Sequence, residues 1–142
     1  MDKNSFFWKM VDGRLPTPPC AKTLGLGFVE IDGERGTIET RFEAVEMFLN
    51  PAGTVHGGFS ATLLDSCMGL AVHTTLEKGM GQTTVEFKIS LVRPITPETG
   101  LIKAEGVVLS RGRRIGTAEG RISDSQGRLL VHGTETCLIF QR

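Results

Sequence analysis

The sequence predicts an α+β fold in which one long helix packs against an antiparallel sheet of five to six strands. Residues 57–77 form the only long segment in which apolar residues recur with helical spacing. Four segments with strand patterns follow it and two precede it, so the expected element order is β-β-α-β-β-β-β. A sheet of this kind has edges, and pairing one edge with a second copy of the chain would remove it.

The segments before the long helix are predicted from turn residues and strand patterns. Three prolines interrupt the chain soon after the N-terminus, and Asp32-Gly33-Glu34-Arg35 is a typical hairpin turn. The expected elements are a helix (residues 1–11), a loop (12–19), two strands (24–32 and 36–43) and a connecting segment (44–55). The 142 residues are assigned to one domain, of which residues 1–23 are an N-terminal extension.

The later segments alternate apolar and polar residues. In the segment 82–94, one face carries apolar side chains and the other carries Glu86, Lys88 and Ser90. Gly79 and Gly81 are expected to end the preceding helix. The row Gly116, Ala118 and Gly120 indicates that another element packs closely there, and the long helix is the expected element. The other expected strands are residues 100–110, 113–123 and 128–140, with turns at Arg111-Gly112-Arg113 and Asp124-Ser125-Gln126-Gly127.

Composition excludes several classes of function. The 16 basic and 16 acidic side chains balance, so no overall field favours nucleic acid or a membrane surface. There is no apolar run of about 18 residues, as a membrane span requires, and the N-terminus lacks the pattern of a signal peptide. The three cysteines show neither metal spacing nor a disulfide framework. We therefore expect a cytoplasmic protein without a bound metal or cofactor.

The loop before the long helix and the helix itself carry the candidate catalytic groups. His56-Gly57-Gly58 stands at the helix start, where free backbone N–H groups and the positive end of the dipole can hold an oxyanion. Asp65 is a carboxylate in an otherwise apolar segment, so it is a candidate nucleophile or general base. Gly57 and Asp65 are about 12 Å apart along a helix, at about 1.5 Å per residue. One chain cannot easily place both at one carbonyl, which predicts a site shared across a two-fold interface.

The spacing of these residues resembles that of a known family. The pattern Asn50-x-x-Gly53-x-x-His56-Gly57-Gly58, followed by Leu63-x-Asp65 and Gly69, is similar to the hotdog-fold acyl-CoA thioesterases, in particular the PaaI-like phenylacetate-pathway branch. The resemblance implies a sheet wrapped around a central helix, homodimers often paired into tetramers, and hydrolysis of acyl-coenzyme A, which is a substrate rather than a cofactor. The acyl group stays open between aryl and short or medium aliphatic chains.

The resemblance also implies a role for each matching residue. Asp65 would attack the thioester or activate water, and the amides of Gly57 and Gly58 would polarise the carbonyl. His56 would support the loop, and Asn50 would orient water or substrate. The family often places a Ser or Thr near the acid on the next strand. Thr84 matches that position better than Thr83, although the two lie on opposite sheet faces and the choice stays open.

A structural role can also explain several of these residues. His56 can cap the loop, Asn50-Pro51 is a common turn pair, and the two glycines can serve close packing alone. Cys67, His73 and His132 lack the spacing of a catalytic or metal site and are expected to be structural. The basic turn Arg111-Gly112-Arg113-Arg114 is either a solvated hairpin or a site for the phosphates of coenzyme A.

Two other functions stay open at this stage. A dehydratase or hydratase acting on acyl thioesters would divide base and acid roles between Asp65 and His56. A non-catalytic acyl-CoA-binding regulator would be expected to carry a DNA-binding segment, and the residues before Leu24 are too few and not basic enough for one.

Overall fold

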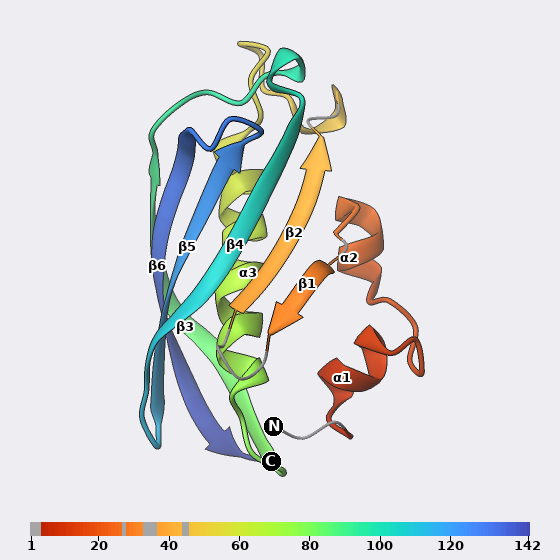
Figure 1. The fold of residues 1–142 in the computed structure, drawn as a ribbon, viewed down its shortest axis with the longest axis vertical. Coiled ribbons are helices and arrows are strands. Elements are labelled where there is room, and N and C mark those ends of the chain that lie inside the picture. The colour runs from red at the N-terminus through yellow and green to blue at the C-terminus, as the bar shows by residue number, and fades with distance from the viewer. Residues whose placement is uncertain (1–3, 27, 33–36, 44–45) are drawn as a thin grey trace.

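The computed structural model describes residues 4–26, 28–32, 37–43 and 46–142, and its architecture is a curved antiparallel sheet around one central helix (Figure 1). The α+β prediction is therefore confirmed. In chain order the helices and strands are α1 (Phe6–Val11), α2 (Pro19–Leu24), β1 (Phe28–Asp32), β2 (Thr37–Glu43), α3 (Gly57–Thr74), β3 (Met80–Leu91), β4 (Leu101–Arg111), β5 (Ile115–Asp124) and β6 (Leu129–Gln141). Two short 3₁₀ helices lie at Glu46–Phe48 and Pro97–Thr99.

The N-terminal segment differs from the prediction at α2. Leu24 ends this helix, so the expected strand from residue 24 is wrong, and β1 begins only at Phe28. Pro19 occupies the first helical position, where its missing N–H costs nothing, and Gly25 follows the helix in the left-handed conformation (φ +66°). The proline-rich stretch that reads as a loop is therefore also a helix start. The expected turn at Asp32-Gly33-Glu34-Arg35 lies mostly outside the described residues.

The central helix α3 begins at Gly57 as expected but ends at Thr74, before the predicted end at Glu77. The hydroxyls of Thr74 and Thr75 donate to the carbonyls of Ala71 and Val72 at 2.7 Å and occupy acceptors at the helix end. The glycines that were expected to end the helix lie beyond it, and Gly81 already belongs to β3. Most of α3 is buried, because the sheet covers it on one side and α1 contacts it on another.

The six strands of the described chain pair in the order β1-β2-β4-β5-β6-β3, and every neighbouring pair is antiparallel. The predicted turns between β4 and β5 and between β5 and β6 are confirmed. In the second turn, Asp124 accepts hydrogen bonds from the backbone N–H groups of Gln126 and Arg128 at 2.9 Å. Gly127 follows with a φ of +78°, a conformation that glycine adopts without strain.

Small residues on the inner face of the sheet let α3 approach closely, as the row Gly116, Ala118 and Gly120 predicts. A Cβ atom added at Gly116 would lie 2.7 Å from the Val72 side chain. The closest contact involves Gly106 on β4, where an added Cβ would overlap the backbone carbonyl group of Cys67. The helix backbone therefore touches the sheet at this point.

Strand β3 forms one edge of the sheet and carries exposed apolar side chains. Val85, Phe87 and Leu91 are 54%, 42% and 59% exposed, so the apolar face expected for this segment is only partly covered within one chain, at Ile89. The pairing of β3 with β6 shifts register between Thr84 and Glu86, which is a β-bulge. None of the described helices is long and apolar enough to cross a membrane.

We predict that Gly106→Ala lowers the free energy of unfolding by about 1–3 kcal/mol or more, the usual scale of overpacking. The added methyl group meets helix backbone, which cannot rotate away as a side chain can. Chemical denaturation of both proteins at one concentration measures the difference. Ser110→Ala, at an exposed position of the same strand, is the matched control. A variant as stable as the wild type would show that α3 does not lie this close to β4.

Candidate functional site

The loop before α3 holds Asn50 in a network of its own. The Asn50 side-chain oxygen accepts from the N–H groups of Ala52 (2.9 Å) and Thr54 (3.3 Å), and its Nδ2 donates to the Thr54 hydroxyl at 2.9 Å. Gly53 completes the turn with a φ of +76°. In this structure the Asn50 side chain therefore braces the loop, which is the turn role considered for it.

His56 caps α3 with its ring. The Gly58 N–H donates to Nδ1 of His56 at 2.9 Å, which places the ring proton on Nε2. The backbone N–H of His56 donates to the Phe48 carbonyl and ties the loop to the helix start. Gly57 is the first helical residue, so its N–H has no acceptor within α3. Of the two candidate oxyanion amides, the one of Gly57 is thus the better placed.

Gly57 borders a cavity of about 240 Å³ at the start of α3. Asn50 also lines it, so the structure brings these two predicted residues to one place. The Leu91 side chain lies over Gly57, and a Cβ added at Gly57 would be 2.8 Å from it. The same cavity is lined by Thr54, Val55, Ser60, Val92, Arg93, Pro94, Ile95 and Val131.

Asp65 lies half-buried in the third turn of α3, on the side that faces β3 and β6. Gly69, one turn later, shows what this side contacts, because a Cβ there would lie 3.1 Å from Oε1 of Glu135 and 3.5 Å from the Thr84 hydroxyl. Asp65 is itself within hydrogen-bonding reach of Glu135. The carboxylate of the central helix therefore has a second carboxyl group as its neighbour.

Of the two candidate threonines on β3, Thr84 belongs to this cluster. Thr84 is half-buried, and its hydroxyl donates to Oε1 of Glu135 at 2.9 Å. Thr83 is exposed. The structure therefore brings Thr84 and Asp65 to the same carboxyl group and leaves Thr83 outside the cluster.

Glu135 on β6 is the residue that sequence reasoning missed. Its side chain is 1% exposed, and its Oε1 also accepts from the Cys137 thiol at 3.0 Å. Burial, with the nearby charge of Asp65, raises the pKa of Glu135 to about 7, although the Cys137 and Thr84 hydrogen bonds act in the opposite direction. A signal was present, because alternation along β6 places Glu135 in the row of inward residues formed by Val131, Gly133, Cys137 and Ile139.

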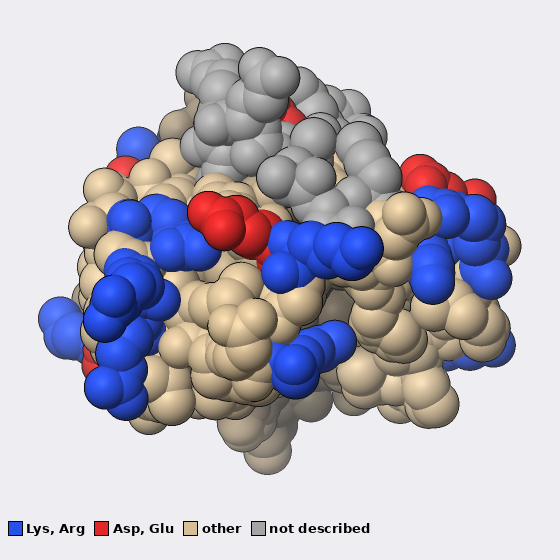
Figure 2. Space-filling model, turned by 90° about the horizontal axis from the view of Figure 1, so that it is seen from below, with Lys and Arg blue, Asp and Glu red and all other residues tan. Residues whose placement is uncertain are grey.

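The structure does not unite all predicted groups within one chain. Gly57 and Asp65 lie on one helix, about 12 Å apart along its axis. The basic turn between β4 and β5 lies at the opposite end of α3 from Gly57, because Gly116 contacts Val72 in the last turn of the helix. Arg113 and Arg114 are exposed there, and Arg111 donates to the Gly112 carbonyl. Figure 2 looks onto this end of the molecule, where basic side chains gather.

The remaining candidate groups have structural surroundings. Cys67 is fully buried, and burial, with the charges of Glu105 and Glu135, raises its pKa to about 12, so it remains a thiol. Burial, with the charge of Arg142, lowers the pKa of His73, whose ring packs against Phe7. His132 contacts Glu119 at 3.3 Å. Among the described residues no cluster of His, Cys, Asp or Glu could hold a metal ion.

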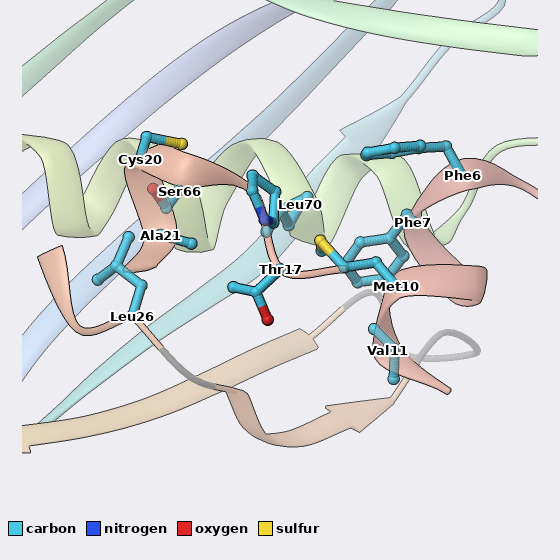
Figure 3. Close-up of a pocket in the computed structure, with 11 residues that line it drawn as sticks. Phe6, Phe7, Met10, Val11, Thr17, Cys20, Ala21, Leu26, Ser66 and Leu70 are labelled. Atoms are coloured by element: carbon cyan, nitrogen blue, oxygen red, sulfur yellow. The ribbon is translucent and has the colours of Figure 1, made fainter. Parts of the chain in front are cut away.

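A second, mostly apolar cavity of about 330 Å³ lies between α1, α2 and α3. In Figure 3 side chains from all three helices surround it, with Ser66 and Leu70 contributed by α3. Asp65 and Gly69 precede these two residues and point to the neighbouring face of the helix. None of the predicted site residues lines this cavity.

Comparison with known proteins identifies the family. The sequence pattern described as "Thioesterase superfamily" matches residues 52–131, more than half of the chain. A relative from Saccharolobus solfataricus, called a "putative esterase", is 30% identical over 108 residues, which are 76% of this chain and 74% of the relative.

Solved structures share the fold. A phenylacetic acid degradation-related protein from Ralstonia eutropha JMP134 has a TM-score of 0.86 and 34% identity, and the match covers 94% of this chain and 99% of that one. The smu.793 protein of Streptococcus mutans UA159, solved bound to acetyl-CoA, has a TM-score of 0.73 and 21% identity over 82% of this chain and 90% of that one. The helix-and-sheet architecture, the family pattern across α3 and these relatives agree, and this chain belongs to the thioesterase superfamily.

Proposed function

We propose that this protein hydrolyses an acyl-CoA thioester to the free acid and coenzyme A. The observation that carries the proposal is the carboxylate of Asp65, half-buried on the central helix of a chain whose family pattern is that of thioesterases. A half-buried carboxylate beside a second carboxyl group costs stability, so a chemical use for it is the simplest reason for its presence.

The reaction needs a group that polarises the thioester carbonyl and a group that delivers the nucleophile. The Gly57 N–H, at the positive end of α3, would donate to the carbonyl oxygen as negative charge develops on it. Asp65 would take a proton from water that attacks the carbonyl carbon, or attack it directly to form an anhydride that water then opens. In either route the C–S bond breaks and the coenzyme A thiolate leaves and is protonated.

The separation of Gly57 from Asp65 implies that two copies form each site. If two α3 helices lie antiparallel, the first turn of one approaches the third turn of the other. The exposed apolar side chains of the β3 edge supply a surface for such pairing, because joining two β3 edges would extend the sheet and cover Val85 and Phe87. Val107, Leu109 and Ile115 remain exposed on β4 and β5 and would serve the expected pairing of dimers into a tetramer.

The same arrangement gives the basic turn a role. Antiparallel helices place the C-terminal end of one α3, and with it the turn Arg111–Arg114, near the Gly57 end of the other. Exposed arginines at that point suit the phosphates of coenzyme A. The acetyl-CoA bound to the Streptococcus mutans relative supports this class of substrate.

We predict that Asp65→Asn lowers kcat for acyl-CoA hydrolysis at least about a hundredfold, the usual scale for losing a general base. The amide is nearly isosteric, so the fold and the oligomer are expected to persist. Release of free thiol from a panel of acyl-CoA substrates measures the effect. Glu77→Gln, an exposed acid just beyond α3, is the matched control. Full activity in Asp65→Asn would remove this carboxylate from the mechanism.

We predict that mixing two inactive variants restores activity. Gly57→Pro removes the proposed oxyanion N–H at the first helical position, where proline costs no helical hydrogen bond, and its ring displaces only the flexible end of Leu91. A mixed dimer of this chain with an Asp65→Ala chain rebuilds one complete site, so co-refolded chains are expected to recover part of the wild-type rate. Each variant alone serves as the control. An active monomer in light scattering would contradict the shared site.

We predict that Arg113→Gln combined with Arg114→Gln raises KM for acyl-CoA about fivefold to thirtyfold, as expected for two partly exposed charge contacts. We expect kcat to change little, because phosphates lie far from the breaking bond. The effect is expected to shrink with an N-acetylcysteamine thioester, which lacks the nucleotide. Arg121→Gln, an exposed arginine elsewhere on β5, is the control. An unchanged KM would show that this turn is a solvated hairpin and does not bind the phosphates.

A further inference from the structure

The two carboxyl groups of Glu135 and Asp65 form a pair that the proposed reaction has not used. Glu135 projects from β6 towards α3 and is almost completely buried, whereas Asp65 approaches it from the helix and keeps partial access to solvent. Two ionised carboxylates in such contact repel each other strongly, and burial makes this repulsion harder to screen. The pair is therefore expected to hold one proton near neutral pH.

The two oxygens of Glu135 have different surroundings, and this difference locates the proton. Oε1 accepts from the Thr84 hydroxyl at 2.9 Å and from the Cys137 thiol at 3.0 Å. Oε2 is buried and has no donor among the described residues. A buried oxygen without a donor is costly as an acceptor but is well suited to carry a hydrogen. The proton of the pair is thus best placed on Oε2 of Glu135.

The titratable groups around Glu135 agree with this placement. Asp65 on α3 is the charged group that contacts it, and its charge raises the pKa of Glu135 in addition to the effect of burial. Cys67 on α3 and Cys137 on β6 are thiols whose pKa values burial raises, so they stay neutral. On β3 and β5 the facing residues are Thr84 and Ala118, which do not titrate.

We propose that Glu135 is a positioning residue for Asp65: its protonated Oε2 donates a hydrogen bond to the Asp65 carboxylate and holds it in orientation for the reaction. The proton on Glu135 leaves the pair with one negative charge instead of two, and the hydrogen bond turns the repulsion between the two carboxyl groups into an attraction. Thr84 acts through Glu135, because its hydroxyl fixes the other oxygen of the same carboxyl group. The catalytic part of this proposal rests on the proposed thioester hydrolysis.

The first test does not depend on activity. Infrared spectra of the wild-type protein, recorded from acid to alkaline pH, are expected to show a protonated carboxyl band that disappears as the pH rises through about 7. The band is expected to be absent in Glu135→Gln and unchanged in Glu119→Gln, a half-buried acid on β5. Asp65→Asn is expected to lower its midpoint, because the neighbouring charge is gone. No such band in the wild type, or the same midpoint in Asp65→Asn, overturns the pair.

Stability gives a second measurement that is independent of turnover. The pKa of Glu135 rises from 4.5 to about 7 on folding, so its contribution is fully present below about 4.5 and is lost as the pH rises to about 7. We expect the free energy of unfolding of Glu135→Gln, relative to the wild type, to increase across that interval and to level off above it. A difference that does not change with pH would mean that Glu135 is not protonated in the folded protein.

Kinetics then tests the positioning role. Glu135→Leu removes the donor and is expected to lower kcat about tenfold to a hundredfold with little change in KM, because a misoriented group affects the chemical step. Glu135→Gln still offers an N–H to Asp65 and is expected to rescue most of that loss. A folded Glu135→Leu with full kcat overturns the role. If the infrared band appears but no acyl-CoA is hydrolysed by the wild type, the pair stands and the proposed function fails.

Discussion

The close approach of α3 to the sheet is the constraint on which the site depends. At Gly106 the helix backbone and the strand are so near that no Cβ fits between them, and Gly116 and Gly120 leave room for Val72 and Met68. These contacts fix the depth and the rotation of the helix. With that rotation set, Asp65 and Gly69 face β3 and β6. The position of the carboxylate thus follows from glycines that are remote from it in sequence.

The second consequence of this packing is electrostatic. Because α3 lies flat on the sheet, the inward positions of β6 from Val131 to Ile139 are covered, including the one occupied by Glu135. A carboxyl group at such a position loses its hydration, and the two donors that it finds both serve the same oxygen. The proximity of Asp65 then makes protonation of the buried group the least costly state of the pair.

At the start of α3, local hydrogen bonds decide which polar groups brace the loop and which remain available to a ligand. The Gly58 amide donates to the ring of His56, so it is already hydrogen-bonded. The Asn50 side chain is hydrogen-bonded within the turn that leads into the helix. What remains for a ligand is the Gly57 N–H beside a cavity. The Gly57 amide and Asp65 are too far apart along one helix to act on the same carbonyl group. The uncovered β3 edge is the surface through which a second copy of the chain could supply the missing group.

The sequence alone determined the element order, the start of α3 and the close contact of the glycine row with a helix, because periodicity and turn residues act locally. It also identified Asp65 as a candidate catalytic residue, because a lone carboxylate in an apolar helical segment is visible in the sequence itself. It missed α2, because proline at a helix start and proline in a loop look alike, and it placed the end of α3 too late. Only the tertiary structure chose Thr84 over Thr83 for the cluster and disclosed the contact of Asp65 with Glu135. Those facts depend on β6 lying beside β3 and under α3, and such a juxtaposition of residues about 50 to 70 positions apart leaves no local pattern in the chain.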